Sequence, residues 1–238
     1  MLMGNFANTV LYEVPTYLGL NFNRNDKQKN KKKKKEMSST NRSNARDNHI
    51  SDYYVTPSKP ILDLFEALKE SECCDLFTAD DGKLHWWHKY LDPCAGGDEK
   101  NEMSYPKVIQ SLGVHKEFIK TVDIRKDSKA EIKADFLQCN WSERYKVVIT
   151  NPPFNIAEDI IKKSFEFVED GGYVIMLLRL NFFGSKKRKE FWQNNMPILT
   201  FVHRERISFT NGQTDSIEYM HCVWKKGVTQ NFTKLSII

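Results

Sequence analysis

The sequence lacks the features that mark several common classes of protein. No apolar run approaches the roughly 18 to 20 residues that are needed to cross a bilayer. The start of the chain also lacks the charged segment, apolar core and small-residue cleavage site of a secretory signal. The five cysteines include no C-x-x-C pair, and the adjacent Cys73 and Cys74 are awkwardly spaced for a mutual disulfide. These absences favour a reduced, cytoplasmic protein that is not embedded in a membrane.

No cluster of metal ligands is visible in the sequence either. His85 and His88 are three residues apart, a spacing that suits a metal, but no further ligands cluster nearby. We therefore interpret both histidines as structural and expect no metal site. Cys94 and Cys139 are interpreted as packing residues.

Positive charge is concentrated at the beginning of the chain. The net charge of the 238 residues is +5. Residues 1–48 alone contain ten Lys or Arg and four acids, about +6, which leaves about −1 for the remainder. The pI of 8.8 therefore says little about the folded part. We expect residues 1–48 to be a disordered basic tail, with a nucleic-acid-binding arm and a true start at Met37 as two further hypotheses.

From residue 49 onward, strand-like and helix-like segments alternate. This alternation predicts a single α/β domain with a doubly wound, mainly parallel sheet and helices on both faces. The last predicted strand is expected to be antiparallel. We expect Thr56 to cap the first helix and Gly171-Gly172 to end the third. Strands are predicted at 88–92, 118–123, 132–136, 145–149, 173–178, 198–203 and 217–224, and helices at 60–69, 103–112, 157–168 and 186–194.

A rigid turn follows the fourth predicted strand. The apolar run Tyr145–Ile149 leads directly into Thr150-Asn151-Pro152-Pro153-Phe154. Each proline fixes φ and removes a backbone donor, so the turn is stiff and its carbonyls stay free. The Asn151 amide offers an acceptor and a donor pair, and Phe154 adds a flat apolar surface. The turn is suited to hold a planar molecule that carries an amino group.

Polar groups follow the earlier predicted strands as well. Because ligands of such sheets bind beyond the carboxyl ends of the strands, these groups are expected to meet at one edge. The turn Asp92–Asp98 contains Gly96-Gly97, which let the backbone approach a ligand closely. Asp123 is suited to accept both hydroxyls of a ribose. Asp135 is suited to accept from an adenine amino group, with Phe136 against the base.

These motifs resemble the class I S-adenosylmethionine-dependent methyltransferases, specifically the DNA adenine-N6 type. Asn151-Pro152-Pro153-Phe154 matches the catalytic motif of that family. Asp92–Gly97 looks like its first cofactor motif, and Tyr53–Pro57 looks like the segment that precedes it. The resemblance spans roughly residues 50 to 226. Two departures are Asp98, where many relatives have another glycine, and a gap from Asp92 to Asp123 that exceeds the usual spacing of about 20 residues.

The resemblance implies a fold, a cofactor and a reaction. Residues 49–238 would form a Rossmann-like methyltransferase domain that binds S-adenosylmethionine and methylates N6 of an adenine flipped out of DNA. The Asn151 side-chain oxygen and the Pro152 carbonyl would hold the amine, and Phe154 would stack on the base. The implied catalytic residues are Asn151, Pro152, Pro153 and Phe154. The implied cofactor-binding residues are Tyr54, Thr56, Pro57, Asp92, Pro93, Cys94, Ala95, Gly96, Asp123, Ile124, Asp135, Phe136 and Asn151.

A nucleic-acid partner would need local positive charge, because the body of the chain has little overall. Basic residues follow two strands on the expected ligand side, where phosphate contacts are sensible. A polar loop at 209–215 is expected to face the same site. The candidate nucleic-acid-binding residues are Lys186, Lys187, Arg188, Lys189, Arg204 and Asn211.

Alternative functions remain open. The same chemistry could act on RNA adenine or on a protein glutamine amide, and a catalytically silent nucleic-acid-binding homologue is a further reading. The sequence has no separate N-terminal helical domain for a protein partner and no recognisable RNA-binding module. The intact Asn151–Phe154 motif argues against a silent protein. The loops are short, with no insertion resembling a target-recognition domain, and monomer and dimer both remain open.

Overall fold

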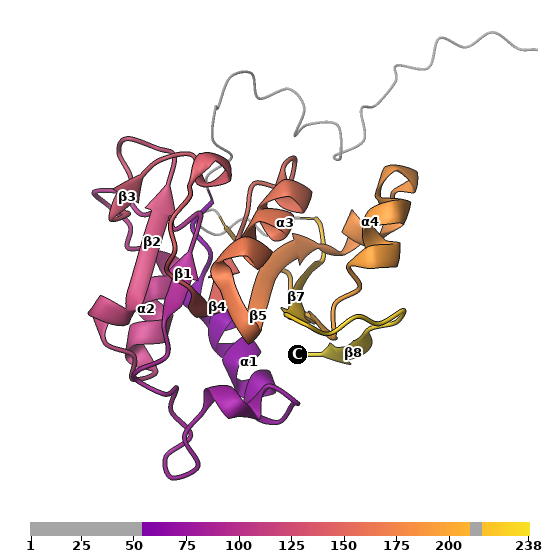
Figure 1. The fold of residues 1–238 in the computed structure, drawn as a ribbon, viewed down its shortest axis with the longest axis horizontal. Helices are drawn as coiled ribbons and strands as arrows, with labels where there is room; N and C mark the ends of the chain where they lie inside the picture. Colours follow the sequence, from indigo (N-terminus) through magenta and orange to yellow (C-terminus); the bar gives the residue numbers. More distant parts are fainter. Residues whose placement is uncertain (1–53, 210–215) are drawn as a thin grey trace, which may run out of the picture.

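A single eight-stranded sheet organises the chain (Figure 1). The computed structural model describes residues 54–209 and 216–238. The predicted basic tail and Asn211 lie outside these residues, so what was predicted for them stays a prediction. Within the described part, no helix has the length and apolar character required to span a bilayer.

The sheet has the strand order β3-β2-β1-β4-β5-β7-β6-β8. The strands are β1 (Tyr90–Asp92), β2 (Ile119–Asp123), β3 (Ile132–Lys133), β4 (Tyr145–Thr150), β5 (Val168–Arg179), β6 (Leu199–Val202), β7 (Tyr219–Lys225) and β8 (Lys234–Ile237). The α-helices are α1 (Ser58–Lys69), α2 (Ser104–Ser111), α3 (Ala157–Phe167) and α4 (Lys189–Asn194). Short 3-10 helices are η2 (Cys74–Leu76), η3 (Lys116–Phe118), η4 (Phe136–Gln138), η5 (Leu180–Gly184) and η6 (Lys186–Arg188).

The predicted mainly parallel sheet is confirmed. Strand β7, the last predicted strand, is antiparallel to both of its neighbours, β5 and β6. The remaining strand pairs are parallel. The prediction missed β8, which adds parallel to β6 at the edge of the sheet. Its four residues are all exposed, so it is too short and too poorly buried to give a clear strand pattern.

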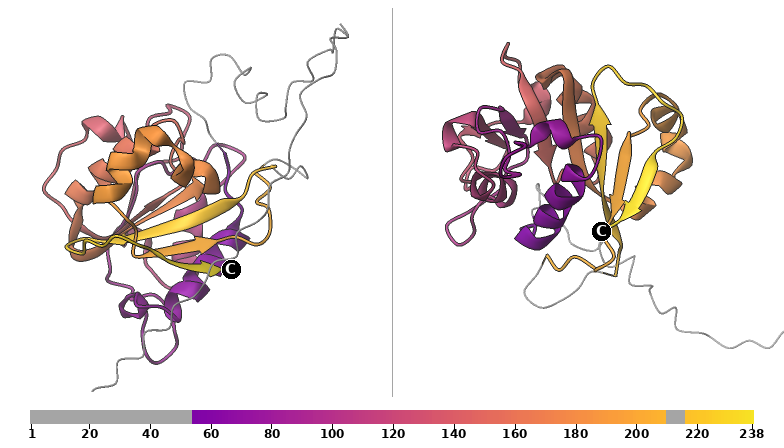
Figure 2. Two further views of the ribbon diagram at one scale, coloured as in Figure 1. Left: turned by 90° about the vertical axis from the view of Figure 1, so that its right-hand side faces the viewer. Right: turned by 90° about the horizontal axis from the view of Figure 1, so that it is seen from below.

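Side chains of the central strands alternate between two buried cores. On one face, Val147 and Ile149 of β4 and Ile175 of β5 pack with residues of α1 and α2. On the other face, Val148 and Met176 pack with residues of α3 and α4. Figure 2 shows α1 and α4 on opposite sides of the sheet. Central strands that are covered on both faces explain the continuous apolar runs in the sequence.

The Gly171-Gly172 pair does not end a helix, as the sequence suggested. Helix α3 ends at Phe167, and β5 starts with the next residue, so both glycines lie within a strand. The pairing of β4 with β5 is irregular here, because the register shifts between Tyr145 and Val147. Gly171 has a φ of +72°, and a Cβ on Gly172 would lie 2.7 Å from the Lys146 carbonyl oxygen. The glycines accommodate this irregularity against β4.

Other boundaries also differ from the prediction. The first strand begins at Tyr90 rather than at residue 88. The third predicted strand shortens to β3 because the Asp135 side chain accepts from Leu137 N and starts η4 instead. Thr56 does not cap α1, since Pro57 occupies the N-cap position without a side-chain hydrogen bond. The hydroxyl of Thr56 contacts Asn151 instead.

Candidate functional site

A cleft at the carboxyl ends of β1, β2 and β4 contains most of the residues that the sequence predicted for the site. Residues from the segment before α1, from the strand ends and from the start of α3 line this cleft together. Ten of the thirteen predicted cofactor-binding residues line it: Tyr54, Thr56, Pro93, Cys94, Ala95, Asp123, Ile124, Asp135, Phe136 and Asn151.

The turn after β1 is built around two glycines in the left-handed region. Gly96 and Gly97 have φ values of 64° and 75°. A Cβ on Gly97 would lie 2.8 Å from the Met103 side chain, so a larger residue would strain the turn. Asp123 anchors this turn, because its Oδ2 accepts from Gly96 N at 2.8 Å. Its Oδ1 accepts from Arg125 N at 2.8 Å.

The side chain of Asp98, the residue that departs from the family pattern, forms hydrogen bonds within its own loop. Its Oδ1 accepts from the backbone N–H groups of Lys100 and Asn101, each at 2.8 Å. The Asn101 amide also donates to the Asp98 carboxylate. Asp98 therefore stabilises the loop that leads toward α2, and it does not line the cleft.

Asp92 and Gly96 do not line the cleft, although both were predicted to bind a cofactor. Asp92 is only 1% exposed, and its Oδ2 has no hydrogen-bond partner among the described residues. Burial raises the pKa of this carboxyl to about 7, and the neighbouring Asp123 charge adds to the shift. Gly96 supports the cleft through its bond to Asp123. The third residue, Pro57, lines a neighbouring cleft instead, together with Arg204 and His203.

Acceptors and apolar surface alternate along the cleft wall. Asp123 is the last residue of β2 and Asp135 follows β3, and the Asp135 side chain accepts from Leu137 N. Ile124 and Phe136 line the cleft beside these acids. A carboxylate has about four acceptor positions, so each acid keeps capacity for a ligand after its backbone bonds are made.

The Asn151 amide is oriented by Thr56. Asn151 Nδ2 donates to Thr56 Oγ1 at 3.1 Å across 95 residues of sequence. Asn151 Oδ1 is buried and has no hydrogen-bond partner among the described residues. Because buried acceptors are normally satisfied, an unpaired oxygen at a cleft wall indicates a place for a donor from a ligand. Tyr54 and Thr56 reach this cleft from the segment before α1.

The other residues of the Asn151–Phe154 motif lie in two different places. Pro153 lines the cleft with Asn151, and Pro152 is buried in the turn. Phe154 instead lines an adjoining groove with Phe182, Lys187 and Arg188. The Phe154 ring also contacts Tyr219 of β7, with the ring centroids 5.9 Å apart.

An aromatic cluster connects the cleft to Phe154. Phe209 contacts Tyr219 at a centroid distance of 5.0 Å and Tyr54 at 5.8 Å. The Arg179 guanidinium carbon lies 4.5 Å from the Phe154 ring centroid. Arg179 and Tyr219 were not predicted, since the pairing of β5 with β4 and with β7 brings them to Phe154.

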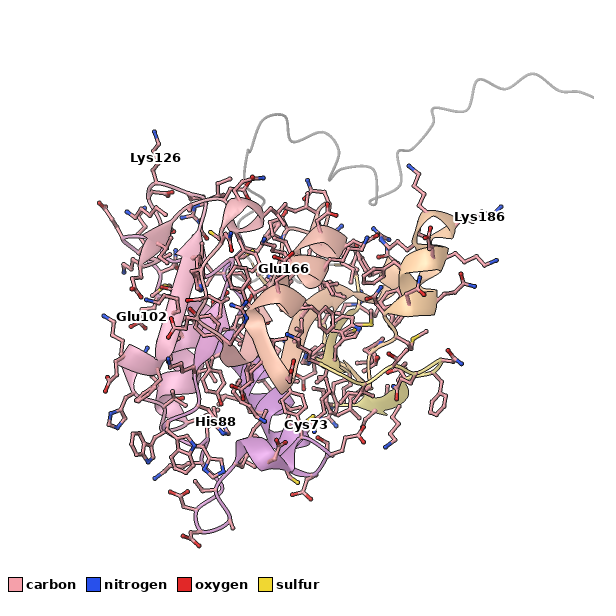
Figure 3. All side chains as sticks on the ribbon, viewed as in Figure 1. Cys73, His88, Glu102, Lys126, Glu166 and Lys186 are labelled. Atoms are coloured by element: carbon pink, nitrogen blue, oxygen red, sulfur yellow. The ribbon has the colours of Figure 1, made fainter. Side chains whose placement is uncertain are left out.

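The predicted basic residues of the described part follow the carboxyl ends of β5 and β6. Lys186 and Lys126 lie at the upper edge in Figure 3, where strands β2 and β5 end, while Cys73 and His88 lie at the opposite edge. Lys187 and Lys189 are exposed, whereas Arg188 lies over Phe182 at 3.8 Å and donates to its carbonyl. Arg204 is exposed at the neighbouring cleft.

Five cleft residues were not predicted. Ile156 and Ile160 are four residues apart at the start of α3, a spacing that could have indicated a shared face. Tyr105 joins a buried chain, because its hydroxyl lies 2.9 Å from His221 Nε2 and His221 Nδ1 lies 2.8 Å from His203 Nε2. The five residues are Ser104, Tyr105, Arg125, Ile156 and Ile160.

Cys94 is partly buried, and His85 and His88 pack among aromatic rings. Burial raises the pKa of the Cys94 thiol well above its ordinary value, which disfavours the nucleophilic thiolate. Burial lowers the pKa of His88 to about 4, and the His85 ring packs 4.4 Å from that of Trp87. Over residues 54–209 and 216–238, no three His, Cys, Asp or Glu side chains are grouped so as to hold a metal ion.

Comparison with known proteins supports the fold. No protein-family model matches the chain, and no curated protein is significantly similar to it in sequence. Among solved structures, a candidate class I S-adenosylmethionine-dependent methyltransferase from Listeria monocytogenes is similar with a TM-score of 0.53 and 14% identity. The match covers 77% of this chain and 65% of the Listeria protein.

A second solved structure gives the same result. A candidate RNA methyltransferase from Pyrococcus horikoshii has a TM-score of 0.53 and 16% identity, over 74% of this chain and 89% of that protein. At these identities the likeness shows the fold alone. The predicted doubly wound, Rossmann-like fold is therefore confirmed.

Proposed function

We propose that this chain transfers a methyl group from S-adenosylmethionine to the exocyclic N6 amine of adenine in DNA. Three features support the proposal: a cleft at the strand ends, the Asn151–Phe154 motif beside it, and basic residues that follow β5 and β6. The fold is compatible with it, since the two solved structures compared above are described as methyltransferases.

The unpaired Asn151 oxygen is the observation that carries the proposal. An aromatic amine is a weak nucleophile, because its lone pair is delocalised into the ring. Thr56 occupies the donor end of the Asn151 amide, so Oδ1 is the acceptor left for an amine hydrogen. Accepting that hydrogen favours a more tetrahedral nitrogen, with its lone pair aimed at the methyl donor. Pro152 supplies its carbonyl as the second acceptor in this proposal.

The cleft residues fit the proposed cofactor. S-adenosylmethionine supplies an electrophilic methyl group on a sulfonium. Asp123 would accept from the ribose hydroxyls, and Asp135 from the adenine amino group of the cofactor. Ile124 and Phe136 would lie against the apolar faces of that base. The left-handed turn at Gly96 and Gly97 would admit the methionine part close to the backbone.

The target base would enter beside Phe154. Methyl transfer would form a nitrogen–carbon bond as the carbon–sulfur bond breaks; the sulfur would leave as a neutral thioether, and the amine nitrogen would release one proton to solvent. Stacking on Phe154 and the bonds to Asn151 would offset the few kcal/mol needed to flip a base out of a duplex. The lysines of η6 would contact phosphates and position the duplex.

Substrate assays with purified protein test this proposal. Tritiated S-adenosylmethionine is supplied with DNA, RNA or protein as separate acceptors, with Asn151→Ala as the control. Transfer to DNA that depends on Asn151 supports the proposal, and transfer to RNA or protein alone would reassign the substrate. No transfer by the unaltered protein to any acceptor would favour a catalytically silent homologue.

A further inference from the structure

Arg179 occupies a position that the proposed chemistry does not explain. It is the last residue of β5 and pairs with Tyr219 of β7. Its guanidinium carbon lies 4.5 Å from the centroid of the Phe154 ring, a stacking distance. The charged group therefore covers part of the ring that would stack on a target base.

The Arg179 side chain also has an unsatisfied donor. Its Nε is buried and has no hydrogen-bond partner among the described residues. No carboxylate in residues 54–209 or 216–238 forms an ion pair with it. Arg188 stacks in a similar way on Phe182, but it donates to the Phe182 carbonyl. A buried donor without an acceptor is costly, which is a reason to look for a ligand that supplies one.

The chemistry of the guanidinium identifies the class of ligand. Arginine stacks on planar rings and donates to phosphate oxygens in a fixed fork, two properties that a lysine ammonium does not combine. A nucleotide offers both partners, since it carries a planar base and a phosphodiester. A protein glutamine amide offers neither the aromatic plane nor the phosphate.

We infer that Arg179 is a nucleic-acid-contacting residue that covers the Phe154 ring in the free protein and donates to the phosphodiester beside the target base when the base enters. This inference rests on the proposed function and extends it, because it selects a nucleic acid over a protein substrate. Arg179 is a binding residue in this account and has no part in the transfer of the methyl group.

The test measures nucleic-acid binding as a function of salt, independently of methyl transfer. Fluorescence anisotropy follows a fluorescein-labelled mixed-sequence DNA duplex and an RNA of the same sequence between about 50 and 200 mM salt. Arg179→Met fills the space over Phe154 without a donor, and Arg179→Lys restores charge without the planar fork. Arg144→Ala is the matched control, because Arg144 is exposed just before β4 and donates to the nearby carbonyls of Trp141 and Glu143.

We expect Arg179→Met to weaken DNA binding about tenfold and to reduce the slope of log K against log salt by about 1. Arg179→Lys is expected to recover the slope but only part of the affinity, and Arg144→Ala to leave both unchanged. A melting temperature close to that of the unaltered protein establishes that each variant is folded. Unchanged affinity and slope in Arg179→Met would overturn the inference, as would absence of DNA and RNA binding by the unaltered protein.

The binding test and the methyl-transfer test can fail separately. Binding that depends on Arg179, without any methyl transfer, would remove the proposed enzyme activity and retain the nucleic-acid contact. Methyl transfer to DNA with no dependence of binding on Arg179 would retain the activity and remove the contact. Preferential loss of RNA binding in Arg179→Met would assign the contact to RNA.

Discussion

The side chains of Thr56 and Asn151 are joined by a hydrogen bond of 3.1 Å from the Asn151 amide nitrogen to the Thr56 hydroxyl oxygen. Thr56 lies before α1 and is 4% exposed, and Asn151 follows β4. The bond occupies the donor end of the amide and leaves Oδ1 as an unpaired acceptor. The orientation of the proposed catalytic amide therefore depends on a segment 95 residues away in the sequence.

Replacing Asn151 by alanine removes the proposed acceptor. We expect the rate of methyl transfer to DNA to fall at least about 100-fold, the scale of losing one preorganised hydrogen-bonding group. The melting temperature should change little, because the side chain makes one bond in the described structure. Steady-state assays check this, with Asn140→Ala, in an exposed loop, as the matched control. An Asn151→Ala protein with full activity would contradict the assigned role.

Replacing Thr56 by valine keeps the shape of the side chain and removes its hydroxyl. The Asn151 amide then loses the partner that fixes its orientation, so we expect kcat to fall about tenfold. Thr56→Ser retains the hydroxyl and should retain most of the activity. Full activity in Thr56→Val together with a loss of kcat in Thr56→Ser would show that the methyl group of Thr56, and not its hydroxyl, is what matters.

Replacing Asp123 by asparagine weakens the support of the cleft. One carboxylate oxygen becomes an amide nitrogen, so a donor faces either Gly96 N or Arg125 N. We expect the dissociation constant for S-adenosylmethionine, measured by calorimetry, to rise about 10-fold or more, since a charge-assisted bond is typically worth about 1.5 to 3 kcal/mol. The matched control is Asp80→Asn, at an exposed position away from the cleft. Equal affinity in both variants would exclude Asp123 from cofactor binding.

Replacing Asp92 by asparagine should change how stability depends on pH. Burial raises the Asp92 pKa from 3.8 to about 7, so between these values the folded protein binds more protons than the unfolded chain. This group therefore contributes stability at low pH and loses that contribution as pH rises from about 4 to 7. The neutral amide cannot ionise, so the stability of Asp92→Asn relative to the unaltered protein should increase over that range.

Two buried histidines make the stability of the unaltered protein depend on pH in the opposite direction. Burial lowers the pKa of His203 from 6.5 to about 4 and that of His221 well below its ordinary value. Their contribution is present above pH 6.5 and is lost as pH falls toward 4. Asp92→Asn and the unaltered protein share both histidines, so the histidine contribution cancels in the difference between their free energies of unfolding. Urea unfolding at several pH values measures the free energy of unfolding of Asp92→Asn and of the unaltered protein. A difference between the two free energies that is constant from pH 4 to 8 would contradict the buried state of Asp92.

The sequence predicted the sheet well because each central strand carries its own pattern. Apolar runs such as Val174–Leu178 are covered on both faces, so local composition was enough. Strand β8 and the glycines within β5 escaped prediction for a different reason. The position of β8 and the irregular start of β5 depend on pairing with strands that are distant in the sequence, and a short stretch of sequence does not show that pairing.

The candidate site also combines residues that a local pattern indicates with residues that only distant contacts bring together. Residues at strand ends, such as Asp123 and Asn151, could be predicted because a parallel sheet gathers its carboxyl ends at one edge. The side chains that contact one another around the site could not be predicted from the sequence. Arg179 reaches Phe154 because β5 pairs with β4, and Tyr105 reaches His221 across 116 residues. Asp92 looked like a ligand from its position in the motif, but its burial places it behind the cleft.

Mass spectrometry of DNA tests the central claim most directly. The chain and its Asn151→Ala variant are each expressed in a host that lacks its own adenine methylation, and the digested DNA is analysed for N6-methyladenine. The account predicts N6-methyladenine in DNA from cells with the unaltered chain and none with Asn151→Ala. DNA without N6-methyladenine from cells that contain the folded, unaltered protein would contradict it.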